Sequence, residues 1–120
     1  MEFSIEKIDH VQVAAPQGSE EEAIGFYSGM LGMKEVEKPQ PLKARGGVWF
    51  QFGNFQLHVG IDEPFVPAKK AHPAFKVSGY DAMQKQLKEK GVEVKVDDSI
   101  PGVERFFVFD PFGNRLEFLK

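Results

Sequence analysis

The order of the expected secondary-structure elements runs twice along the 120-residue chain, and this repetition constrains the fold more than any other feature. In the first half, a helix is expected to start at Ser19, with Glu22 three residues later as a capping box, and to stop at Gly32. Apolar stretches that predict strands lie at residues 8–14, around Val36, at 47–52 and at 55–61. The dipeptide Gly53-Asn54 is a two-residue hairpin signal between the last two. The first half therefore predicts the order β-α-β-β-β.

The second half repeats that order after a loop that contains three prolines. A helix is expected from about Asp81 to Gly91. Strands are expected at residues 75–77, 92–96, 105–110 and 115–119. We therefore predict an α+β fold in one domain, residues 1–120, made of two tandem βαβββ modules that form a curved mixed sheet. The first module covers about residues 1–62 and the second about 72–120.

Composition excludes several classes of partner. The net charge is −3 and the 15 Lys and Arg residues are scattered, so no nucleic-acid partner is expected. The first residues lack the pattern of a signal peptide and no apolar stretch is long enough for a membrane span, so a cytoplasmic location and no membrane partner are expected. Cysteine is absent, which leaves His, Asp and Glu as the metal ligands to consider.

Period-two alternation gives four strands one apolar and one polar face. The polar faces carry His10 and Gln12, Gln56 and His58, His72 and Lys76, and Arg115 and Glu117. A pseudo-twofold axis between the halves would bring the three histidines and Glu117 towards a common centre. Imidazoles and a carboxylate suit a divalent metal ion with positions left open for substrate. A lone histidine on a strand is more often a surface or satisfied core residue, and Glu117 could be merely solvated, but four coincident positions favour a metal site.

Other side chains are candidates for substrate binding. Arg105 shares a face with Phe107 and could hold an anionic group of the substrate. It could equally be a surface arginine paired with Glu104 or another acid. Phe50 and Phe107 could line an apolar pocket, although most of the 12 phenylalanines must belong to the core.

The sequence resembles the vicinal oxygen chelate superfamily, which includes glyoxalase I, bleomycin- and fosfomycin-resistance proteins, methylmalonyl-CoA epimerase and extradiol dioxygenases. The motifs that carry the resemblance are Ile8-Asp9-His10-Val11, Phe26-Tyr27 with Leu31-Gly32, Leu57-His58-Val59, and Asp110-Pro111-Phe112-Gly113-Asn114-Arg115-Leu116-Glu117-Phe118. The resemblance implies paired modules that form a cup and a homodimer. It also implies a divalent ion (Zn, Ni, Co, Mn or Fe) bound by His10, His58, His72 and Glu117, from one chain or from two.

Departures from the family pattern narrow the expected activity. Bacterial glyoxalase I has a glutamate where this chain has His58, so a substrate other than a glutathione adduct is favoured, and extradiol cleavage usually requires a longer chain. Pro73 could place His72 in the loop before its strand. We expect a metal-dependent lyase, isomerase or resistance-type transferase acting on a small oxygen-chelating substrate. Its base would be a metal-bound hydroxide or a displaced, catalytic Glu117. The alternatives are a metal-free protein that sequesters a drug or metabolite, as in bleomycin resistance, and a structural or regulatory module with a vestigial site.

Overall fold

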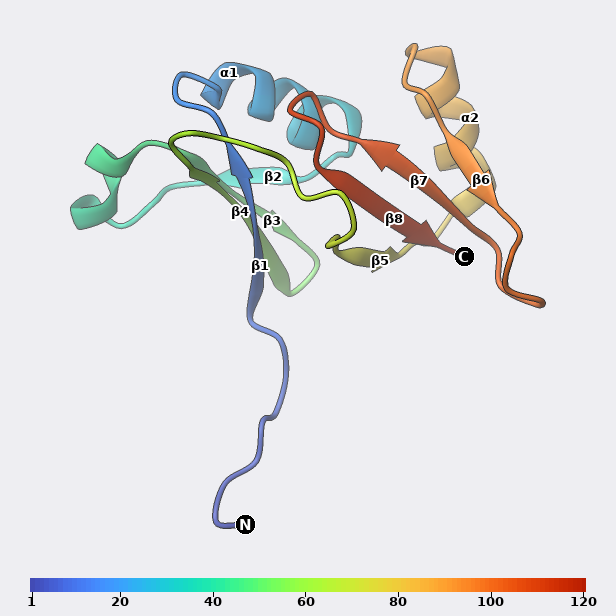
Figure 1. The fold of residues 1–120 in the computed structure, drawn as a ribbon, viewed down its shortest axis with the longest axis horizontal. Helices are drawn as coiled ribbons and strands as arrows, with labels where there is room; N and C mark the ends of the chain where they lie inside the picture. The colour runs from blue at the N-terminus through green and yellow to red at the C-terminus, as the bar shows by residue number, and fades with distance from the viewer. The chain divides into compact units, whose positions relative to one another are not determined.

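The computed structural model describes all 120 residues and contains two four-stranded mixed sheets. Each sheet belongs to its own compact unit, Met1–Glu63 or Pro64–Lys120. Both units follow the order strand, helix, strand, strand, strand (Figure 1). The predicted α+β class and the tandem repeat of element order are thereby confirmed. No helix has both the length and the apolar character that crossing a membrane requires.

The first sheet has the strand order β1-β4-β3-β2, with β1 parallel to β4 and the other pairs antiparallel. Its strands are β1 (His10–Ala15), β2 (Lys34–Val36), β3 (Val48–Phe52) and β4 (Phe55–Ile61). Phe52 pairs with Phe55, so the two-residue hairpin at Gly53-Asn54 forms as predicted. Phe50 and Leu57 are neighbours in this register and both are fully buried, which marks the face that packs against the helix.

The helix of the first unit departs from the expected regular α-helix. It consists of a short α1 (Glu20–Ala23) and a π-helical η1 (Ile24–Met30), and a separate 3-10 helix, η2 (Gln40–Arg45), was not expected. The predicted capping box was wrong: Ser19 is the N-cap residue, but its side chain makes no capping bond and its buried hydroxyl has no partner. The ring of Tyr27 in η1 packs on Phe50 at 5.6 Å between centroids, which attaches the helix to its sheet.

The second sheet has the order β5-β8-β7-β6, with β5 parallel to β8. Its elements are β5 (Ala74–Lys76), α2 (Tyr80–Glu89), β6 (Lys95–Asp97), β7 (Arg105–Phe109) and β8 (Arg115–Leu119). Tyr80 and Leu87 of α2 are buried, and the Tyr80 ring lies 5.2 Å from that of Phe106. Strand β6 starts later than predicted because the Val92 N–H still bonds to the Leu87 carbonyl at the end of α2.

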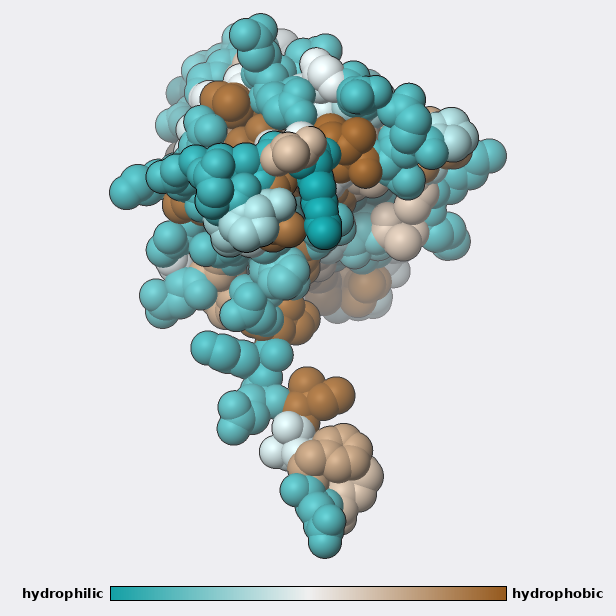
Figure 2. All heavy atoms as spheres, turned by 90° about the vertical axis from the view of Figure 1, so that its left-hand side faces the viewer, coloured by the Kyte–Doolittle hydropathy of each residue, from teal (hydrophilic) through white to brown (hydrophobic).

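The nine residues before β1 lie in no helix or strand and are exposed to solvent. This segment extends away from the sheet of its own unit (Figure 1). Met1, Phe3, Ile5 and Ile8 are all exposed, so large apolar side chains stand free along it, as the tan and brown spheres in Figure 2 show.

Candidate functional site

His10 and His58 lie side by side on the polar face of the first sheet. His10 of β1 pairs with Gln56 of β4, and His58 lies two residues further along β4, opposite Trp49 of β3. The ring of His58 stacks on His10 at 4.2 Å and on Trp49 at 3.8 Å between centroids. Period-two alternation therefore brings the two predicted ligands of this unit together, as expected for one sheet face.

Each of these imidazoles has one nitrogen held by a neighbour. His10 Nδ1 lies 3.0 Å from Asp9 Oδ2, and His58 Nε2 lies 2.8 Å from Gln56 Oε1. Burial, followed by the charge of His10, lowers the pKa of the His58 ring below its usual value, which favours the neutral imidazole. A neutral imidazole that donates through one nitrogen keeps a lone pair on the other, so this pair can offer nitrogen donors to a metal ion.

His72 and Glu117 form the corresponding pair of the second unit. His72 Nε2 lies 2.8 Å from Glu117 Oε1, and His72 Nδ1 lies 2.7 Å from the carbonyl oxygen of Lys70. His72 stands in the loop before β5, the position that Pro73 suggested, yet it reaches Glu117 because β5 runs parallel to β8 with Ala74 opposite Glu117. The Lys70 carbonyl can only accept a hydrogen bond, so His72 Nδ1 carries a proton. His72 Nε2 and Glu117 Oε1 face each other, and a proton or a metal cation fits between these two acceptor atoms.

Arg105 pairs with acids, although not with its sequence neighbour. Its guanidinium lies 3.3 Å from Glu117 Oε2 and 3.5 Å from Asp97 Oδ2, and Glu104 instead pairs with Lys120. The Ser99 hydroxyl and backbone N–H, with Arg105 beside them, lower the pKa of Asp97 below its usual value. Of the two roles left open for Arg105, the structure shows pairing with an acid, and that pairing fixes Oε2 of Glu117.

A compact loop sets where β8 begins and so which of its side chains reach this face. Asp110 is buried, and its carboxylate accepts the backbone N–H groups of Phe112 and Asn114 and the side-chain amide of Asn114, at 2.8–2.9 Å. Five residues separate Phe109 from its partner Arg115, against two in the hairpin of the first unit. The most specific sequence motif of the chain is therefore a turn that places Arg115 and Glu117 on the face of Phe107.

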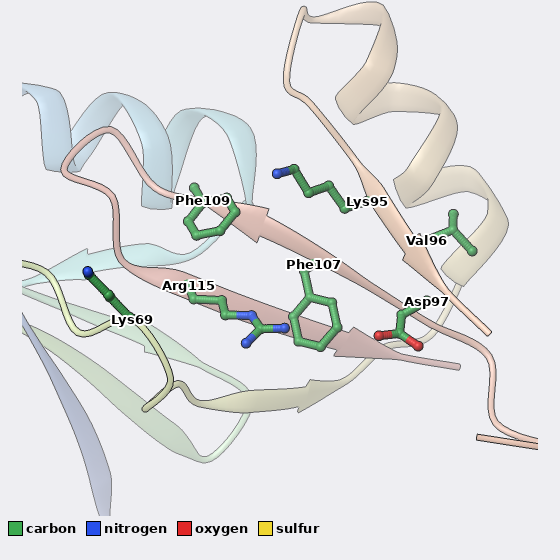
Figure 3. A pocket seen from close by; sticks show the side chains of 7 residues that line it. All are labelled: Lys69, Lys95, Val96, Asp97, Phe107, Phe109 and Arg115. Atoms are coloured by element: carbon green, nitrogen blue, oxygen red, sulfur yellow. The ribbon is translucent and has the colours of Figure 1, made fainter. Parts of the chain in front are cut away.

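A pocket of about 300 Å³ opens on the same face of the second sheet (Figure 3). It is lined by Lys69, Lys95, Val96, Asp97, Phe107, Phe109 and Arg115. Sequence reasoning did not single out Lys69 or Lys95 as site residues. The strand register was the missing information for Lys95, because it pairs with Phe107 across β6 and β7.

The two phenylalanines predicted to line a pocket differ in their surroundings. Phe50 is fully buried against Tyr27, so it belongs to the core rather than to an accessible pocket. Phe107 is buried as well, but its ring lines the pocket and lies 5.5 Å from that of His72. Each unit contributes two of the four predicted metal ligands, and neither pair is joined by a third His, Cys, Asp or Glu side chain that could complete a metal site.

Comparisons with known proteins agree on the family. The model of the Glyoxalase/Bleomycin resistance protein/Dioxygenase superfamily matches residues 7–118. A glyoxalase family protein from Bacillus anthracis has 53% identity and a TM-score of 0.96 over 99% of this chain and 98% of its own. A glyoxalase family protein from Enterococcus faecalis has 25% identity and a TM-score of 0.69 over the whole of both chains. Lactoylglutathione lyase from Agrobacterium tumefaciens shares the fold, with 18% identity and a TM-score of 0.75 over 94% of this chain and 92% of its own. No curated protein matches the sequence.

Proposed function

Because the chain belongs to the Glyoxalase/Bleomycin resistance protein/Dioxygenase superfamily, we propose that it is a divalent-metal-dependent enzyme. Its substrate is a small molecule whose oxygen atoms chelate the ion, and its reaction is that of a lyase, an isomerase or a resistance-type transferase. The observation that carries this proposal is the pair formed by His72 Nε2 and Glu117 Oε1, which lie 2.8 Å apart although the two residues are 45 positions apart in sequence.

The chemistry of the donor atoms fits a metal ion. The Lys70 carbonyl fixes the proton of His72 on Nδ1, which leaves Nε2 directed at the carboxylate, as in metal sites where the second nitrogen is held by a carbonyl. His10 and His58 each have one nitrogen held in the same way. These four side chains would hold the ion, and when bound it would supply Lewis-acid polarisation of the substrate oxygens.

Residues of the second unit would position the carboxylate that does the chemistry. Arg105 holds Glu117 at Oε2, so Oε1 is the oxygen directed at His72 and at an incoming group. Glu117 is buried, and the ring of Phe107 lies next to it in the cross-strand register, which limits the access of water. We assign proton transfer to Glu117 in a form displaced from the ion, since a buried carboxylate on a positioned strand is suited to general acid-base work once it is no longer a ligand.

Metal titration of the purified full chain tests the proposal. Calorimetric titration with Zn²⁺, Ni²⁺, Co²⁺ and Mn²⁺, with elemental analysis of the dialysed protein, should give one ion per set of four ligands. Substitutions Glu117→Gln and His10→Ala should each weaken binding by about 100-fold or more, since loss of an outer-shell partner alone costs about 10- to 100-fold.

Glu104→Gln is the matched control, because it removes an exposed carboxylate that pairs only with Lys120 among the charged groups. Its metal affinity should equal that of the wild type. A wild-type protein that binds none of these ions, or a Glu117→Gln variant that binds them as well as the wild type does, contradicts a metal site at these residues.

A metal-free binding protein of the bleomycin-resistance type is the second candidate, and the packing of His58 favours it. His58 is buried, stacks on Trp49 and His10 and contacts Gln56, so its ring is part of an aromatic cluster held by protein contacts. Under this alternative, His10→Ala would leave ligand binding largely intact, whereas the enzyme would lose both metal uptake and turnover.

A further inference from the structure

We propose that the pocket of the second unit is an anion subsite, which binds a carboxylate, phosphate or phosphonate group carried by an apolar body. This inference rests on the proposed function, and it identifies the substrate of that enzyme as a small organic anion. The pocket volume of about 300 Å³ is at the lower end of the range for small-molecule sites.

The charge of the pocket lining is the first reason. Lys69, Lys95 and Arg115 line it together with a single carboxylate, that of Asp97. Asp97 already pairs with Arg105 at 3.5 Å, so its charge is compensated from outside the lining. In a chain whose net charge is −3, the excess of cations here is local and attracts an anion.

Arg115 is the residue best prepared for that anion. It is half-buried, its guanidinium has no carboxylate partner, and it lies 4.0 Å from the ring centroid of Phe107 (Figure 3). Stacking on a ring holds the guanidinium plane in place while its N–H donors stay free for a planar oxyanion. Partial burial strengthens such a charge-assisted contact relative to one in open water.

Lys95 and Phe109 extend the subsite. The Lys95 ammonium lies 5.1 Å from the ring centroid of Phe109, and its nearest acid, Glu93, is 3.9 Å away at an exposed position. The side chain of Phe109 is 44% exposed, which is unusual for a phenylalanine and leaves a ring for the apolar body of the ligand. With Lys69 included, the pocket thus offers three cations and two aromatic rings.

The position of the pocket connects it to the proposed chemistry. Phe107 lies opposite Glu117 in the strand register, and Phe109 lies opposite Arg115. Arg115 and Glu117 are two residues apart on one strand, a separation of about 7 Å. A small organic acid spans that distance, so its charged group can contact Arg115 while its reactive oxygens reach Glu117.

Two other cavities lack this combination. One, of about 230 Å³ in the first unit, is lined by two acids and two lysines, and its Lys43 already pairs with Glu37. Another, of about 300 Å³ in the second unit, has Lys120 paired with Glu104 and no aromatic residue. Of these three cavities, only the one around Arg115 combines an excess of cations over acids with aromatic side chains in its lining.

The test is an NMR titration of the metal-stripped full chain with benzoate, phenylphosphonate and the neutral benzamide. Benzoate or phenylphosphonate should shift the backbone amides of β7 and β8, and the tighter of the two identifies the preferred anion. Benzamide should bind at least tenfold more weakly. Arg115→Gln should weaken anion binding by about tenfold or more, and Arg115→Lys should restore part of it.

Lys85→Gln is the matched control, because Lys85 is an exposed cation of α2 and its loss changes the net charge equally. Its anion affinity should stay within about twofold of the wild type. The subsite is refuted if Arg115→Gln binds both anions as the wild type does, if Lys85→Gln loses as much affinity, or if benzamide binds as tightly as benzoate.

Metal titration of Arg115→Gln separates the two proposals. An unchanged metal affinity together with lost anion binding supports the subsite. Anion binding in a protein that takes up no metal supports the pocket and refutes the enzyme, whereas metal uptake without anion binding refutes the subsite alone.

Discussion

The side chain of Glu20 is a polar link between the helix of the first unit and the start of β3. Its carboxylate accepts the Gly47 N–H at 2.8 Å, and this bond lowers the pKa of Glu20 below the ordinary value of 4.5. A depressed pKa in the folded state contributes stability that is present above pH 4.5 and is lost as the pH falls through the folded-state pKa. In the wild type, the free energy of unfolding should therefore decrease as the pH falls below about 4.5. We expect this decrease to be smaller in Glu20→Gln, as measured by urea denaturation at several pH values.

Glu21→Gln provides the control at the neighbouring position of α1, because Glu21 is exposed and forms no hydrogen bond through its side chain. Its pH profile should follow that of the wild type. Identical profiles for the wild type and Glu20→Gln would show that the Gly47 contact carries no charge-dependent stability.

At the scale of elements, the approach of β3 to β4 depends on a residue without a side chain. Gly47, just before β3, has φ +88°, and a Cβ there would lie 2.2 Å from the carbonyl oxygen of Val59. We expect Gly47→Ala to lower the unfolding free energy by about 2 kcal/mol or more, since it combines a left-handed backbone with a clash against rigid main chain. Chemical denaturation measures this loss.

Gly60→Ala, on β4, is the comparison for that substitution. A Cβ at Gly60 would meet the Gln12 amide at 2.4 Å, but this is the end of a flexible side chain that can turn into solvent. Its effect should stay below about 1 kcal/mol. Equal losses for the two variants would mean that the contact with Val59 does not limit the packing of β3.

The elements also show how far the sequence determines the structure. Period-two alternation and turn residues predicted the order of strands and the hairpin at Gly53-Asn54, because both signals are local. The capping box was wrong because the Ser19 side chain makes no capping bond, and the first residue of the helix, Glu20, bonds instead to the Gly47 N–H. The contact of His72 with Glu117 needed the parallel pairing of β5 with β8, a long-range register that no local pattern encodes. For the same reason Lys95 was missed as a site residue.

For the whole molecule, the exposed segment before β1 gives the expected homodimer a physical basis. Phe3 is 71% and Ile5 91% exposed, and they alternate with Ser4 and Glu6 in the period of a strand with one apolar face. The segment leads into β1, which is an edge strand of its sheet. We propose that a second copy of the chain covers these side chains.

The expectation that residues 1–120 form one domain stays a prediction.

The double substitution Phe3→Ser with Ile5→Ser tests this proposal by sedimentation velocity over a range of concentrations. Burial of a phenylalanine or isoleucine side chain contributes about 1.5–3 kcal/mol, so removing two of them from each chain should weaken dimerisation by about 100-fold or more. Val66→Ser with Val96→Ser is the matched control, because these valines are also exposed, at 75% and 60%, but lie outside the segment. The control should dimerise as the wild type does. A wild type that sediments as a monomer at all concentrations, or a double variant that dimerises normally, would show that the segment has no partner in a second copy.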